Sequence, residues 1–314
     1  NMCTQDTSPL KRIDTSFAHY VAKRKQAENA HLENGIPDYA FDLDYELRAK
    51  LMQIPHFHSI CKKITATIET REIQFFNQKA LAVGPSQFPE IFQMGTDCAH
   101  RLGIGIPNIF VYPNPTMNAF TYATDDITPM IVLFSGLVER MTPGELKCVI
   151  AHECGHIHNQ HLVFQNVINA ILNSGAGYFG MALSLANIAL MQFWTRAGEV
   201  TADRAALICA DDPELARNVN AKLLYGGMLN NAGQVDLESL RQQLDQTLNN
   251  PTKVYELLND HPSAIRRIFA EKEFEECEVF YRWRPELKKP GMSVRGKREV
   301  DERCKKLVNI LDND

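Results

Sequence analysis

The stretch at residues 151–157, Ala-His-Glu-Cys-Gly-His-Ile, constrains this chain more than any other part of it. It contains the pattern His-Glu-x-x-His, and the residues that lead into it predict a helix. Thr142 suits the N-cap of that helix, and Glu145, three residues later, completes a capping box. On a helix, His152 and His156 are four residues apart, so both imidazoles project from one face.

Two neutral imidazoles at this spacing can hold one Zn²⁺, and Glu153 lies where a carboxylate can take a proton from a water activated by the metal. A catalytic zinc usually has three protein ligands. In the metzincin class the third is a histidine six residues after His156, but that position is Leu162. His158 and His161 leave the ligand face of the helix, so we expect them at the surface or behind the ligands.

A glutamate on a later helix is the other common third ligand. The next acidic residue after Glu153 is Glu199, and Asp203 follows it by four residues, which places both on one helical face. This spacing suits a glutamate ligand and an aspartate that accepts a hydrogen bond from a ligand imidazole. The alternative is an ordinary exposed acidic pair beside Arg196 and Arg204.

Strands are predicted before the motif helix and helices after it. Runs of β-branched and aromatic residues at 108–112, 118–122 and 130–134 predict three short strands. Helical segments are predicted at 143–161, 163–173, 177–207, 213–231, 236–249 and 262–276. We therefore expect an α+β fold that is predominantly α-helical, with a small antiparallel sheet beside the motif helix.

The chain divides into three regions by composition. We expect an N-terminal helical region at 1–84, a catalytic domain at 85–280 and a basic C-terminal tail at 281–314. Between residues 282 and 306 there are ten Lys and Arg against four Asp and Glu. The simplest interpretation of this tail is a solvated surface segment.

Charge and cysteine content limit the partners and the compartment. The net charge of -5 gives no indication of nucleic-acid binding. The eight cysteines include no Cys-x-x-Cys pair, and we expect mostly reduced thiols and a cytoplasmic location. The first 30 residues contain no apolar run typical of a signal peptide.

Residues 162–195 form a long uncharged run that bears on membrane association. A part of it approaches the length of roughly 20 residues that spans a bilayer. Its asparagines and glutamines favour buried helices of a soluble domain, and the run merges into the segment that carries Glu199. Contact with a membrane is the alternative that we keep.

His-Glu-x-x-His followed by Glu-x-x-x-Asp resembles the gluzincin metallopeptidases. More narrowly, it resembles the soluble branch of the family that contains the CAAX prenyl endopeptidase and the bacterial heat-shock protease HtpX. The resemblance covers roughly residues 85–275. It also rests on the segments Asn118-Ala119-Phe120, His261-Pro262 and Arg267-Ile268.

The resemblance implies a zincin-like fold and a metalloendopeptidase with one zinc ion per chain. His152, His156 and Glu199 would be the metal ligands. Glu153 would be the general base, and Asp203 would support His152.

On the substrate side, the resemblance implies that His261 lies near the developing oxyanion and that Arg267 is structural. Asn118, Ala119 and Phe120 would form an edge strand that pairs with an unfolded or flexible polypeptide substrate.

Two other readings stay open. One is a latent or inactive zinc-binding relative that serves as a peptide-binding scaffold or is held shut by its own segments, with the N-terminal region or the basic tail over the cleft. The other is a membrane-associated protease of membrane proteins.

Overall fold

A computed structural model describes most of the chain in eight stretches. They are residues 31–33, 35–54, 57, 73–124, 127–162, 185–226, 236–248 and 264–308. The predicted helix at 163–173 and the first part of the one predicted at 177–207 lie outside the described residues.

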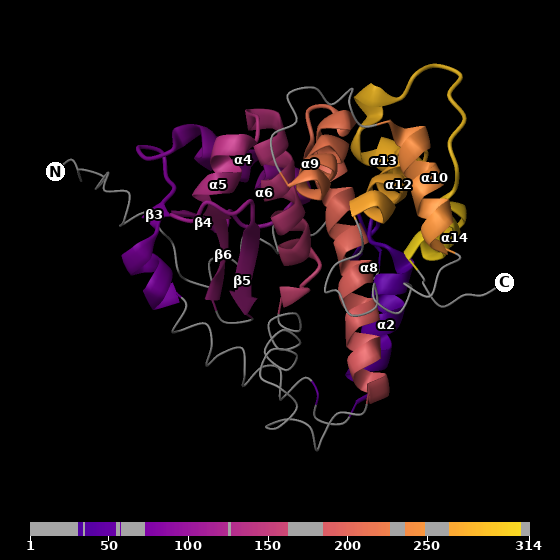
Figure 1. Ribbon diagram of the computed structural model, residues 1–314, viewed down its shortest axis with the longest axis horizontal. Coiled ribbons are helices and arrows are strands. Elements are labelled where there is room, and N and C mark those ends of the chain that lie inside the picture. Colours follow the sequence, from indigo (N-terminus) through magenta and orange to yellow (C-terminus); the bar gives the residue numbers. More distant parts are fainter. Residues whose placement is uncertain are drawn as a thin grey trace.

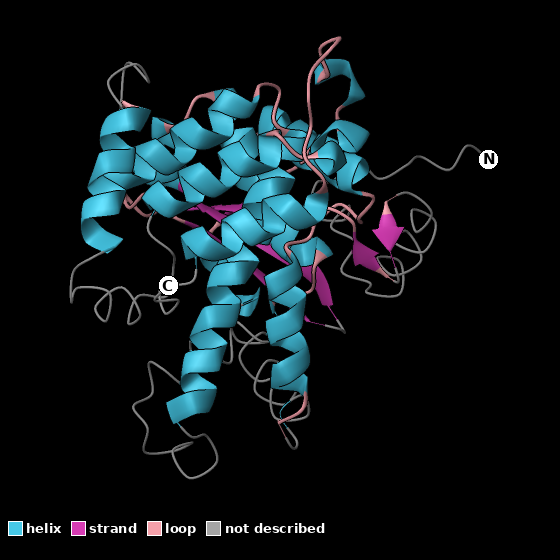
Figure 2. Ribbon diagram, turned by 90° about the vertical axis from the view of Figure 1, so that its right-hand side faces the viewer, coloured by secondary structure: helices cyan, strands magenta, loops and turns pink. Residues whose placement is uncertain are grey.

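Helices dominate, which confirms the predicted fold class. The helices are α2 (Asp42–Met52), α4 (Pro89–Leu102), α5 (Ser135–Arg140), α6 (Pro143–His158), α8 (Leu185–Cys209), α9 (Pro213–Tyr225), α10 (Leu237–Leu248), α12 (Ala264–Glu275), α13 (Glu278–Trp283) and α14 (Lys297–Val308), with a 3-10 turn at Pro285–Leu287. The strands are β1 (Leu32–Glu33), β2 (Ile36–Pro37), β3 (Leu81–Ala82), β4 (Asn108–Tyr112), β5 (Ala119–Thr124) and β6 (Ile127–Phe134). In Figure 2 most of the helices lie in front of the strands of the sheet.

The four-stranded sheet has the order β3-β4-β6-β5. All three strands predicted next to the motif are present. The sheet is mixed rather than wholly antiparallel, because β4 pairs with β6 in parallel while the β3–β4 and β5–β6 pairs are antiparallel. The chain passes beyond β6 to form β5 and then returns, so β5 lies at the edge of the sheet.

The two faces of the sheet pack against different partners because successive strand residues point to opposite sides. Ile131 and Leu133 of β6 lie in the main hydrophobic core with residues of α4 and α6. Met130 and Val132 belong to a second cluster on the other face, where Phe76, Phe120 and further aromatic rings meet. The sheet is therefore fixed from both sides next to α6.

Helix α6 lies between the sheet and α8 (Figure 1). It begins as the sequence predicts: Thr142 Oγ1 accepts a hydrogen bond from the Glu145 backbone N–H, and Glu145 Oε2 accepts one from the Thr142 N–H at 2.8 Å. At Gly155 it approaches α8 closely. A Cβ at this position would lie 2.7 Å from Ala205 Cβ and 3.0 Å from Ala202 Cα, so the packing requires glycine.

Segments from both ends of the chain pack onto α8. Helix α2 runs beside it in Figure 1, and Leu51 of α2 and Cys304 of α14 are buried in the same core. Arg204 of α8 lies between them, where it donates to Asp301 Oδ1 at 2.6 Å and to the Tyr39 carbonyl oxygen at 3.1 Å.

The interpretation of the basic segment as solvated is therefore wrong for α14. Its apolar face is buried while its Lys and Arg side chains point outward or form ion pairs. The regional boundaries at residues 84 and 280 stay predictions.

Among the helices that the structure describes, none has both the length and the apolar character needed to cross a bilayer. Residues 163–184 of the uncharged run lie outside the described residues. Near the end of the run, Met191 and Trp194 of α8 are buried in the core.

We predict that Gly155→Ala loosens the contact between α6 and α8. The added methyl group meets backbone atoms that cannot move aside, and overpacking of this kind costs about 1–3 kcal/mol. Better helix propensity offsets up to about 1 kcal/mol of this loss. Urea unfolding of the metal-free protein should show a net loss of stability. Gly296→Ala is the control, since a Cβ there meets nothing within 4 Å; equal stability of the two variants would contradict the prediction.

Candidate metal centre

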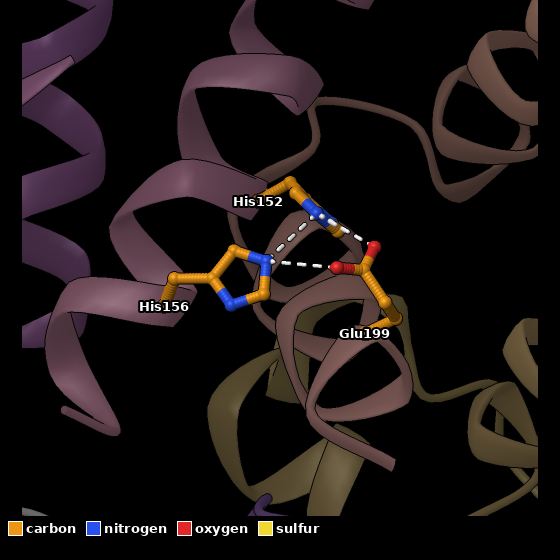
Figure 3. Close-up of side chains that lie close together, drawn as sticks. All are labelled: His152, His156 and Glu199. Carbon is orange, nitrogen blue, oxygen red and sulfur yellow. Dashed lines mark hydrogen bonds and ion pairs between the residues drawn. The ribbon is translucent and has the colours of Figure 1, made fainter. Parts of the chain in front are cut away.

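Three side chains converge where α6 meets α8 (Figure 3). His152 and His156 come from one face of α6, and Glu199 reaches them from α8. The two Nε2 atoms are 3.1 Å apart. Each Nε2 lies 3.4 Å from an oxygen of Glu199, Oε2 for His152 and Oε1 for His156.

The spacing and chemistry of these donors fit zinc. A tetrahedral zinc ion with bonds of about 2.0–2.1 Å to nitrogen and oxygen separates its ligand atoms by about 3.3–3.4 Å. The three distances here lie close to that value. Two imidazoles and a carboxylate also make up a common set of protein ligands in catalytic zinc sites.

His152 is held in position from behind by Asp203. The Nδ1 of His152 lies 3.0 Å from Asp203 Oδ1. Arg267 donates to both oxygens of this carboxylate, through Nε at 2.7 Å and Nη2 at 2.6 Å. Burial raises the pKa of Asp203, but Arg267 and His152 outweigh burial and hold that pKa below its usual value. An ionised Asp203 accepts the Nδ1 proton, which leaves the Nε2 lone pair of His152 facing Glu199.

His156 is held from behind by His161. The two Nδ1 atoms are 2.8 Å apart, and the other nitrogen of His161, Nε2, lies 2.8 Å from Asp44 Oδ2. His161 is fully buried, so of the two positions expected for this residue it occupies the one behind the ligands and not the one at the surface. His158 is also buried, and its Nδ1 forms a hydrogen bond with the Tyr39 hydroxyl at 2.9 Å.

The electrostatics of the centre favour a bound positive charge. Burial lowers the pKa of His152, but hydrogen bonds and charge attraction from Asp203 and Glu199 overcome this and raise the pKa to about 10. Burial also lowers the pKa of His156, and there it dominates. The carboxylates thus stabilise one positive charge at this point, as a proton or as a metal ion that takes its place.

Glu153 points to the cavity beside the three donors. Its Oε2 accepts a hydrogen bond of 2.5 Å from the hydroxyl of Thr121 on β5. Sequence reasoning did not single out Thr121. Strand alternation contains the signal, because Thr121 shares a face with Ala119 while Phe120 and Tyr122 point to the aromatic cluster.

A cavity of about 470 Å³ opens next to the three donors. Residues 117–122 form one wall, α6 and α8 carry the metal-binding groups, and α9 and α12 close the far side. The predicted substrate residues Asn118, Ala119 and Phe120 all line it. Among the described strands, β5 pairs with β6 alone, so its outer edge is free for a further strand.

The far wall of the cavity contains a buried glutamate. Glu271 of α12 accepts a hydrogen bond from Asn220 Nδ2 at 2.9 Å, and burial raises the pKa of this carboxyl well above its usual range. The repulsion from Asp203 adds to this shift, while Arg267 opposes it. His261, the predicted oxyanion residue, lies outside the described residues.

The sequence also matches the model of a known protein family. Residues 85–274 match the model of peptidase family M48. The chain belongs to peptidase family M48. The match covers more than half of the chain and includes both segments that carry the three converging donors. It confirms the predicted resemblance to the HtpX-like gluzincin family; the placement in a soluble branch stays a prediction.

Two relatives align with 60% or more of this M48 chain. The plastoglobule-localized metallopeptidase 48 of Arabidopsis thaliana, described as chloroplastic, is 30% identical over 211 residues, which make up 66% of this chain and 60% of the relative. A Protease HtpX homolog of Moorella thermoacetica is 26% identical over 225 residues, 60% of this chain and 73% of the relative.

Other similarities are shorter or more distant. Protease HtpX of Acinetobacter baumannii (strain AYE) is 32% identical over 89 residues, 28% of this chain and 30% of that protein. The chain therefore aligns with less than two thirds of the length of several curated M48 relatives. Among solved structures, Ste24p of S. mikatae gives a TM-score of 0.37 at 17% identity, with coverage of 73% of this chain and 61% of that one.

We predict that Glu199→Gln lowers zinc affinity by more than the roughly 10–100-fold typical of residues behind the ligands. The amide is a much weaker ligand than the carboxylate and carries no charge. Zinc retained after dialysis against a weak chelator, measured by mass spectrometry, tests this. Glu153→Gln is the matched control and should keep its zinc. Full retention by Glu199→Gln would show that the third ligand is another residue.

We predict that Glu271→Gln stabilises the fold at neutral pH. Because the folded state raises the pKa of Glu271, it keeps a proton that the unfolded chain releases above its ordinary pKa of about 4.3. Stability therefore falls as pH rises through the window between these two pKa values, by at most about 1.4 kcal/mol per pH unit, and the amide removes this loss. Unfolding at pH 4, 6 and 8 should show a widening gap in favour of the variant. Exposed Glu139→Gln should show none, and a constant gap for Glu271→Gln would refute the assignment.

Proposed function

We propose that this chain is a zinc-dependent endopeptidase that hydrolyses peptide bonds in unfolded or flexible polypeptides. The observation that carries the proposal is the convergence of two imidazoles and one carboxylate, at the spacing that fits tetrahedral zinc, on a cavity that also exposes Glu153. Membership of family M48 supports the same class of chemistry. We propose one zinc ion per chain, held by His152, His156 and Glu199.

When bound there, zinc would supply a water molecule of lowered pKa and polarise the carbonyl oxygen of the scissile bond. The residues around it carry the proton and hold the substrate. Glu153 is placed to accept a proton at its carboxylate and to return it to the leaving amine. The hydrogen bond from Thr121 holds one oxygen of the Glu153 carboxylate in place. Because the group is planar, this also restricts where its other oxygen can lie.

The edge strand β5 offers the means to bind a polypeptide. A substrate in extended conformation can add to the free edge beside residues 118–122 through main-chain hydrogen bonds, which need little sequence specificity. This requires the bound segment to be locally unfolded. His261 completes the proposal as a group near the oxyanion, on the strength of the family resemblance alone.

The structure bears on one of the two alternatives, the latent relative whose cleft is covered by its own basic tail. None of the described residues between 281 and 308 lines the cavity, and α14 is packed into the core away from it. Occlusion of the cleft by this segment, one way in which a latent relative could be held shut, therefore finds no support in the described part of the chain. A cytoplasmic location remains part of the proposal and rests on the cysteine content; association with a membrane remains the competing view.

We expect Glu153→Gln to bind zinc as the unmodified chain does and to lose cleavage of unfolded casein by roughly 10²–10⁴-fold, the usual contribution of a general base. Thr121→Val, which keeps the side-chain shape but removes the hydroxyl, should lower kcat with a smaller effect and little change in KM. Removal of zinc with a chelator should abolish cleavage, and readdition should restore it.

Activity that survives in Glu153→Gln, or after complete removal of the metal, would overturn the proposed function. A metal-loaded chain with an intact fold and no cleavage of any unfolded protein would instead favour the scaffold.

A further inference from the structure

A buried carboxylate on α2 connects the N-terminal segment to the metal centre. Asp44 is fully buried, and three side chains reach it. Trp194 Nε1 donates to Oδ1 at 2.8 Å, and Thr201 Oγ1 donates to Oδ2 at 2.8 Å. The third is His161, whose Nε2 lies 2.8 Å from Oδ2. A buried charge is stable only with such partners.

The direction of each hydrogen bond follows from the chemistry of the groups. The indole N–H of Trp194 can only donate. Thr201 Oγ1 accepts from the Phe41 backbone N–H at 3.2 Å, and its own proton is directed to Asp44. Burial raises the pKa of Asp44, but His161 and Thr201 outweigh it and leave the pKa below its ordinary value. Asp44 is thus an acceptor toward all three neighbours.

This fixes the tautomers of two histidines in turn. An imidazole that donates to Asp44 through Nε2 offers its Nδ1 as an acceptor, so His161 Nδ1 accepts a hydrogen bond of 2.8 Å from the Nδ1–H of His156. The Nε2 of His156 is then free of a proton. That nitrogen is the atom that faces His152 and Glu199.

The chain is built to bring His161 back to this point. Helix α6 ends at His158, and Gln160 takes a left-handed conformation with φ of 57°. The turn lets the His161 N–H donate to the His156 carbonyl oxygen at 3.1 Å. Gly198 of α8 faces the ring, and a Cβ there would lie in van der Waals contact with it, 3.4 Å from His161 Cε1.

We propose that Asp44, acting through His161, is a positioning residue that fixes the tautomer and orientation of His156 as a zinc ligand. The proposal rests on the proposed function in that it takes His156 as a ligand. Asp203 does the same directly for His152. Asp44 lies outside the segment 85–274 that matches the family model, so a part of the chain beyond that segment completes the metal centre.

Asp44→Asn tests the proposal with a change of almost no volume. The introduced NH₂ can face His161, which then accepts through Nε2 and carries its proton on Nδ1. His156 is forced to protonate at Nε2, the atom needed by the metal. Zinc affinity of the 314-residue chain, measured by competition with a chelator dye, should fall by about 10–100-fold. The optical spectrum of the cobalt-substituted protein should change as well.

Asp38→Asn is the matched control. Asp38 lies in the same segment, is also buried, and also accepts an indole N–H, from Trp283 at 2.7 Å, but it has no contact with the histidines of the centre. It should lose stability without loss of zinc affinity. If Asp44→Asn binds zinc as tightly as Asp38→Asn at comparable stability, the proposal is overturned.

A double-mutant cycle tests whether the effect passes through His161. Once His161→Ala is present, Asp44→Asn should add little further loss of zinc affinity. Full additivity of the two losses would contradict the relay.

Imidazole ¹⁵N shifts of the unmodified chain test the tautomers without any substitution. His161 should carry its proton on Nε2 and His156 on Nδ1 in the zinc-loaded protein, and the opposite tautomer of His161 would overturn the proposal. The tautomer of His161 can also be read in the metal-free protein. A chain with the expected tautomer that binds no zinc would refute the proposed function while the relay from Asp44 stands.

Discussion

The close contact between α6 and α8 is the constraint on which the rest of the structure depends. Glu199 is 43 residues beyond His156 in the sequence, and it reaches the two histidines only because α8 approaches α6 without side-chain bulk between them. Gly155 permits this, with Ala202 and Ala205 facing it. The sheet supports α6 from the other side, so the positions of all three donor groups are set by packing rather than by the metal.

Several charged side chains are buried around this contact. Isolated buried charges are strongly unfavourable, and each one here has a partner. Arg267 neutralises Asp203, Arg204 neutralises Asp301, and Asp44 receives three donors. Two of these carboxylates act on the imidazoles of the centre. Asp203 contacts Nδ1 of His152, and Asp44 contacts Nε2 of His161, whose Nδ1 contacts Nδ1 of His156. The polar core therefore serves the orientation of two imidazoles, one directly and one through a further ring.

The charged groups and the strand edge lie on different walls of the cavity. α6 and α8 supply the charged groups, and β5 supplies an outer edge that no described strand covers and the hydroxyl that holds Glu153. β6 is packed in the core on one face and against aromatic rings on the other, and β5 is paired with β6 along the edge of the sheet. A polypeptide bound there would lie against a preformed wall.

The sequence by itself determined the motif helix with its capping box, the three strands and the mainly helical remainder, because each depends on local spacing and residue type. It also indicated His152, His156 and Glu199 as donors, but the meeting of Glu199 with the two histidines depends on the contact between α6 and α8. It could not determine that β4 pairs with β6, since pairing between strands is a matter of distant contacts. Helical spacing placed His161 off the ligand face but could not predict its contact with His156, because α6 ends at His158 and Gln160 turns the chain back. The buried face of α14 was not predicted, because its few apolar residues are spread among many charged ones. Only the tertiary structure brought Asp44, more than 100 residues away, to His161, because nothing local to either residue records a contact between them.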